Sequence, residues 1–135
     1  MEKLLIDTNI VVDLLGKREN FYQEAQELFT LADEDDVRLF ISAMTFATIH
    51  YLISKHLNED EARKVMIKFK LLVKILPLED KILELALASD FRDYEDAIQY
   101  HTALENNLDI IITRNKKDFK TSRIPVLTAR EYLNR

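Results

Sequence analysis

The stretch that decides the fold is Leu4-Leu5-Ile6-Asp7-Thr8-Asn9, near the start of the chain. Its three apolar residues indicate a buried strand, and the apolar run Ile10-Val11-Val12 that follows indicates a helix. Asp7 is therefore expected at the carboxyl end of a strand, the edge of an open α/β sheet where ligands bind. Thr8 and Asn9 can both cap the helix, which would leave the acid for chemistry.

Strand-like and helix-like segments alternate along the rest of the chain. Short apolar runs predict five strands, at Lys3–Ile6, Arg38–Ser42, Val73–Leu76, Asp109–Thr113 and Pro125–Leu127. Helical periodicity lies between them, at Phe21–Leu31, Thr45–Lys55, Glu59–Leu72 and Leu78–Ala88, and again from about Tyr94. This alternation favours an α/β fold, with a parallel sheet covered by helices on both faces.

The composition limits the classes of function. A length of 135 residues fits one domain, 1–135, and no apolar run is long enough to cross a membrane. We expect a cytoplasmic protein, because the chain begins without a signal peptide. The net charge of −5 argues against nucleic-acid binding driven by overall charge. Gly16 is the only glycine, so glycine-rich phosphate loops are absent.

Further acids occur in positions that resemble that of Asp7. Asp93 and Asp96 are three residues apart at the start of a predicted helix and share a face, although spacing does not decide which points into the crevice. Asp118 follows the apolar run 110–112 by a short polar loop, and Asn115 supplies a neutral oxygen nearby. Carboxylates gathered at one sheet edge indicate a divalent-metal site.

Positive charge gathers around Asp118 in spite of the negative total. The cations are Arg114, Lys116, Lys117, Lys120 and Arg123, and Lys17-Arg18 follows the first helix. This pattern fits either a basic rim for phosphates or a solvated surface. Asp13, on the first helix, is either a partner for a site residue or an exposed acid.

Three segments together resemble the PIN-domain family, including toxins of the VapC type. They are Ile6-Asp7-Thr8-Asn9, Asp93-Tyr94-Glu95-Asp96-Ala97-Ile98-Gln99 and Ile112-Thr113-Arg114-Asn115-Lys116-Lys117-Asp118-Phe119. The resemblance spans nearly the whole chain, with the motifs in the family's order and spacing. It implies a three-layer α/β/α sandwich with a parallel five-stranded sheet, and a ribonuclease site that uses Mg2+ or Mn2+.

The resemblance also implies roles for individual residues. Asp7 and Asp96 would be metal ligands, and Asn115 or Asp118 would occupy the position of the last acid. Asp7, Asp96 and Asp118 are accordingly the expected catalytic acids. The polar residues expected to line or support the site are Thr8, Asn9, Asp13, Thr48, Asp93 and Thr113. Arg114, Lys116 and Lys117 would contact RNA phosphates.

The chain departs from the family pattern at Thr48. The family usually places a glutamate on the helix after the second strand, and Thr48 stands at that position. A threonine hydroxyl is neutral and short, so metal affinity should be lower. His50 lies two residues further on and points elsewhere on a helix.

Several functions remain open on the sequence alone. The first is a metal-dependent endoribonuclease, the toxin of a toxin–antitoxin pair. The second is a weakened PIN fold that binds RNA or docks an antitoxin protein, which the loss of the glutamate favours. An apolar stripe that includes Phe46 and Ile49 would serve a homodimer as well as a core. Phosphatases of the haloacid-dehalogenase type and phosphorylated receiver domains are minor alternatives. The phosphatases need a second acid where this chain has Asn9. Receiver domains have a lysine on the last strand, and the predicted strand Pro125–Leu127 contains none.

Overall fold

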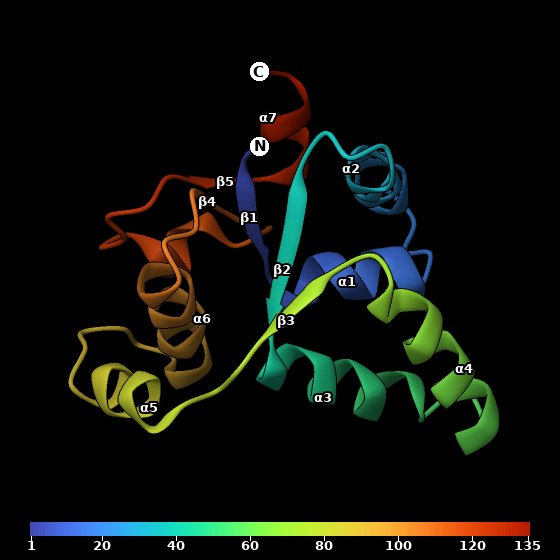
Figure 1. Ribbon diagram of the computed structural model, residues 1–135, viewed down its shortest axis with the longest axis horizontal. Coiled ribbons are helices and arrows are strands. Elements are labelled where there is room, and N and C mark those ends of the chain that lie inside the picture. The colour runs from blue at the N-terminus through green and yellow to red at the C-terminus, as the bar shows by residue number, and fades with distance from the viewer.

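A five-stranded, fully parallel sheet forms the centre of the computed structural model, which describes residues 1–135 (Figure 1). The strands are β1 (Lys3–Ile6), β2 (Arg38–Ser42), β3 (Lys74–Leu76), β4 (Ile110–Ile112) and β5 (Val126–Leu127). Their order across the sheet is β3-β2-β1-β4-β5. The predicted parallel five-stranded α/β fold is confirmed, with β3, β4 and β5 slightly shorter than expected.

Seven α-helices surround the sheet. They are α1 (Thr8–Leu15), α2 (Tyr22–Asp33), α3 (Ala43–Ile53), α4 (Glu59–Lys70), α5 (Asp80–Leu87), α6 (Tyr94–Glu105) and α7 (Ala129–Leu133), and a 3-10 turn, η1, spans Lys116–Phe119. The predicted helices are confirmed to within a few residues at each end. None of these helices combines the length and the apolar character that crossing a bilayer requires.

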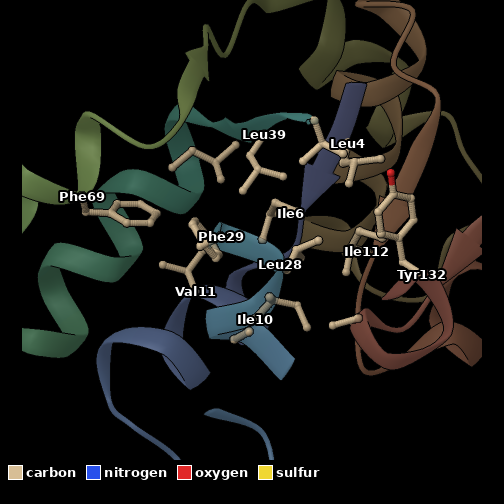
Figure 2. Packing of buried hydrophobic residues seen from close by; sticks show 14 of the residues in the cluster. Leu4, Ile6, Ile10, Val11, Leu28, Phe29, Leu39, Phe69, Ile112 and Tyr132 are labelled. Carbon is tan, nitrogen blue, oxygen red and sulfur yellow. The ribbon is translucent and has the colours of Figure 1, made fainter. Parts of the chain in front are cut away.

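Alternate residues of the strands supply two separate cores, one on each face of the sheet. Leu4 and Ile6 of β1 point into a cluster of 17 buried residues under α1, α2, α3, α4 and α7 (Figure 2). Leu5 points the opposite way, into a cluster of nine buried residues that includes Tyr100 of α6. Because both faces are covered, every residue of β4 is apolar and buried.

The strand order places a topological switch point between β1 and β4. The chain adds β2 and β3 on one side of β1 and then β4 and β5 on the other. Ile6 pairs with Ile112, so the next residues, Asp7 and Thr113, leave the sheet side by side. In open α/β sheets the crevice at such a point is where ligands bind.

The large core should dominate stability. Leu28 of α2 is fully buried in it, and truncation to alanine would leave a cavity beside the sheet. We expect Leu28→Ala to lower the free energy of unfolding by about 2–5 kcal/mol, measured by urea denaturation. The control is Leu71→Ala, at a leucine that is 85% exposed, which should change it by less than about 0.5 kcal/mol. Similar losses for both variants would contradict the assigned core.

Candidate functional site

Asp7 lies at the carboxyl end of β1, and the residue is only 7% exposed. Oδ2 accepts a hydrogen bond from Thr113 Oγ1 at 2.7 Å. Oδ1 accepts from the backbone N of Thr8 at 2.8 Å and from Nε2 of Gln99 at 3.3 Å. Asp7 itself is the N-cap of α1, so the expectation that Thr8 or Asn9 would cap this helix is wrong. The acid is pinned by donors from three segments of the chain.

Thr45 of α3 supports this arrangement from behind. Its Oγ1 accepts a hydrogen bond from Gln99 Nε2 at 2.7 Å and lies 3.0 Å from Thr8 Oγ1, to which it is hydrogen-bonded. Ser42, the N-cap of α3, donates to the same oxygen at 3.2 Å. Ser42, Thr45 and Gln99 are all buried, and the sequence did not single them out. The available signal was Gln99, which lies three residues after Asp96 on the same helix.

The structure brings most of the predicted acids to one open hollow of about 380 Å³ at this edge of the sheet. The predicted site residues that line it are Asp7, Thr8, Asn9, Asp93, Asp96, Asn115 and Asp118. Asp96 is half-buried in the first turn of α6, and Asp118 is exposed in η1. Asp93 is the N-cap of α6, and its Oδ1 accepts from the backbone N of Asp96 at 3.0 Å.

These acids influence each other's ionisation. Burial raises the pKa of Asp7 above its ordinary value, although the hydrogen bonds from Thr113, Thr8 and Gln99 oppose the rise. Burial, followed by the charges of Asp7, Asp93 and Asp118, raises the pKa of Asp96 to about 7. Negative charge is therefore concentrated here, and no positive group is among the causes of either pKa shift, which is typical of a functional site.

The donor chemistry fits a divalent cation. Carboxylate and amide oxygens, the ligands that Mg2+ and Mn2+ prefer, line the hollow. The pKa of Asp96 is raised first by burial and then by its charged neighbours, and a cation would offset this second contribution. The geometry is looser than that of a formed metal centre, because no three His, Asp or Glu side chains lie close enough together to share one ion.

Asp13 is buried and paired with Arg114, so it is a partner of another predicted residue and not an exposed acid. It is 1% exposed, and its two oxygens accept from Nε and Nη2 of Arg114 at 2.8 and 3.2 Å. The Arg114 guanidinium also lies over the ring of Phe21, 4.2 Å from its centroid. The backbone N of Arg114 donates to Asn9 Oδ1 at 3.4 Å. These contacts tie the loop after β4 to α1.

Two other predicted residues lie apart from the acids. Lys116 forms an ion pair of 3.0 Å with Glu131 of α7. Thr48 is partly exposed on α3, does not line the hollow and makes no side-chain hydrogen bond. The threonine hydroxyl that does reach the site is Thr45, one helical turn earlier. Thr48 therefore makes no polar contact that could replace the carboxylate of the usual glutamate.

The fold and the acidic crevice together define an α/β protein whose site lies at the switch point of a parallel sheet. The chain belongs to the PIN domain family, whose model matches residues 3–117. Ribonuclease VapC1 of Aquifex aeolicus (strain VF5) is 25% identical over 139 residues, which cover 99% of this chain and 95% of that protein.

Solved structures show the same fold. A toxin-antitoxin complex from Klebsiella pneumoniae contains a chain that is 28% identical with a TM-score of 0.69, covering 93% of this chain and 97% of that one. VapBC2 from Rickettsia felis, bound to a DNA fragment from its promoter, gives 21% identity and a TM-score of 0.68, covering 93% and 96%.

The raised pKa of Asp96 predicts a pH-dependent stability. The pKa of Asp96 is about 7 in the folded chain, against an ordinary value of 3.8 that applies to the unfolded chain. The folded state therefore binds the proton more tightly than the unfolded state, and it loses stability as the pH rises from about 4 to about 7. Asp96→Asn removes this loss. With metal chelated, we expect the variant to gain about 1–2 kcal/mol at pH 8, after allowance for screening at a half-exposed site, and nothing near pH 4.

The measurement is urea denaturation at both pH values. Asp36→Asn, in an exposed turn far from the site along the chain, is the matched control and should show no such pH dependence. An equal gain at both pH values would contradict the ionisation argument, because it would reflect the amide itself.

Proposed function

We propose that this chain is a divalent-metal-dependent ribonuclease of the VapC type and the toxin of a toxin–antitoxin pair. The observation that carries the proposal is the convergence of Asp7, Asp96 and Asp118 at the switch point of the sheet. The relative named Ribonuclease VapC1 supports RNA as the substrate. The Klebsiella pneumoniae toxin-antitoxin complex supports an antitoxin protein as the partner.

Asp7 and Asp96 would hold Mg2+ or Mn2+, with Asp118 or Asn115 as a further ligand. PIN-domain ribonucleases of the VapC type generally use divalent metals. When bound, such an ion activates water and neutralises charge on the scissile phosphate. A carboxylate offers about four lone-pair positions, and three on Asp7 already accept hydrogen bonds, so Oδ2 keeps one open for a cation.

The surrounding polar residues orient this acid. Thr113, Gln99 and the backbone of Thr8 hold both oxygens of Asp7 in place, so the carboxylate does not have to reorganise when it binds a ligand. Burial keeps bulk water away from Asp7, while Asp96 and Asp118 remain accessible to a substrate. The roles of Asp7, Asp96 and Asp118 as catalytic acids are part of this proposal.

Cleavage of RNA tests the proposal directly. The purified chain should cut single-stranded RNA in the presence of Mn2+ and stop when a chelator is added. Asp7→Asn and Asp96→Asn should each lower the rate by at least about 100-fold, because changes to groups that merely support metal ligands already cost about 10–100-fold. Asp36→Asn should leave the rate unchanged. Cleavage that survives both site substitutions would point to a contaminating nuclease and sink the proposal.

The second candidate function is a weakened PIN fold that binds RNA or an antitoxin without cutting. Two observations favour it: Thr48 stands in place of the usual glutamate, and no three acids lie close enough together to bind one metal ion.

Formation of a homodimer also remains a prediction. Of the apolar stripe on α3, Ile49 is buried in the core and Tyr51 is 63% exposed.

Restoring the missing acid separates the two candidates. Thr48 lies three residues after Thr45 on α3, so a glutamate there faces the same side of the helix. We expect Thr48→Glu to raise Mn2+ affinity roughly tenfold in calorimetric titrations, and to raise the cleavage rate with it. Ala47→Glu adds the same charge at the exposed neighbouring position and is the matched control. Equal affinities for the two variants would mean that the missing acid does not limit the site.

A further inference from the structure

A second hollow, of about 370 Å³, opens beside the acidic one. It lies between two segments, residues 90–96 before and at the start of α6, and residues 117–121 in and after η1. The two hollows share Asp93, Asp96 and Asp118 as lining residues, so they adjoin at the acids. A chain-like ligand that crosses the acids would therefore enter the second hollow.

Three of the nine residues that line the second hollow are cations that make no ion pair within the protein. Arg92, Lys117 and Lys120 are exposed, and none of them takes part in an ion pair or a side-chain hydrogen bond. Other cations of the same region are occupied: Arg114 is bound by Asp13 and Lys116 by Glu131. The cations that cluster around Asp118 in the sequence are therefore of two kinds in the structure. Some are held in internal ion pairs, and others are free to bind a ligand.

We propose that Arg92, Lys117 and Lys120 bind phosphates of an RNA strand next to the one held at the acids. The inference rests on the proposed function, and it replaces two of the three phosphate contacts expected from the sequence. Arg114 and Lys116 would have to break internal ion pairs to bind a phosphate, whereas Lys117, Lys120 and Arg92 would break none. Free, exposed cations are the groups that gain most from meeting phosphate charges.

The remaining features of the hollow agree with a single strand. Phe91 lines it and is braced by Tyr100, with ring centroids 5.2 Å apart, so an aromatic surface accompanies the cations. Four carboxylates also line this hollow and oppose phosphate binding, those of Asp90, Asp93, Asp96 and Asp118. A cation held by Asp96 and Asp118 would offset the charge of these two. Arg18 lines the first hollow and likewise forms no ion pair. Unpaired positive charge is thus available in both hollows.

The test measures binding of RNA without cleavage. In an Asp7→Asn background, which prevents cutting, a fluorescein-labelled single-stranded RNA oligonucleotide is titrated in the presence of Mn2+, and anisotropy is followed over a range of salt concentrations. Lys117→Ala with Lys120→Ala should weaken binding about tenfold at low salt and reduce the slope of log affinity against log salt by about 1.4, that is about 0.7 for each phosphate that is no longer neutralised.

The matched control removes the same charge elsewhere. Lys64→Ala with Lys68→Ala changes two exposed, unpaired lysines on α4, which lies on the opposite side of the sheet from α6 (Figure 1). This pair should leave the slope unchanged. All four lysines are exposed and form no ion pairs, so both double variants should fold normally, as circular dichroism would verify.

The outcomes separate this inference from the proposed function. Equal losses for the two lysine pairs, or no loss for either, would overturn the inference, even if the wild-type chain cleaves RNA and the Asp7→Asn variant does not. A loss of slope confined to the Lys117 and Lys120 pair would support the phosphate contacts, even if the wild-type chain proves unable to cleave. Absence of any RNA binding would overturn both.

Discussion

The buried carboxylate of Asp7 is the constraint on which the rest of this structure depends. A buried charge is tolerated only when hydrogen bonds replace the water it has lost. Its donors come from the first turn of α1, from Thr113 after β4 and from Gln99 on α6, and Thr45 holds Gln99 in turn. Segments that are distant in sequence must therefore meet at one point for the chain to fold with Asp7 inside.

The same arrangement sets function against stability. Partial burial, followed by the charges of Asp7, Asp93 and Asp118, raises the pKa of Asp96 to about 7, so near neutral pH the acids repel one another. A cation between the acids would remove that repulsion, and binding that is specific to the folded state stabilises it. The electrostatic repulsion is thus concentrated at the position where a bound cation would relieve it. Meanwhile the two apolar cores on either side of the sheet keep the fold together.

The local sequence pattern predicts the framework well but not the contacts between distant segments. The strand before Asp7 and the parallel sheet follow from apolar runs and their alternation with helices, which are local signals. The pair of Asp13 with Arg114 joins residues 101 positions apart, and no spacing rule anticipates it. For the same reason the sequence did not show that Thr45, rather than Thr48, reaches the site. That choice depends on how α3 is rotated against α6.

The neutral residue at position 48 changes how charge is divided across the site. The Thr113 hydroxyl and the Gln99 amide donate hydrogen bonds to Asp7, and Thr45 holds Gln99 in place, so these neutral groups satisfy the oxygens of Asp7 but contribute no negative charge. A site with one acid fewer holds a cation less firmly, yet it also repels the phosphates of a nucleic acid less strongly. If the chain binds RNA as proposed, unpaired cations next to the acids, such as Lys117 and Lys120, would carry a larger share of the binding. Loss of the glutamate and the free lysines are therefore consistent parts of one electrostatic arrangement.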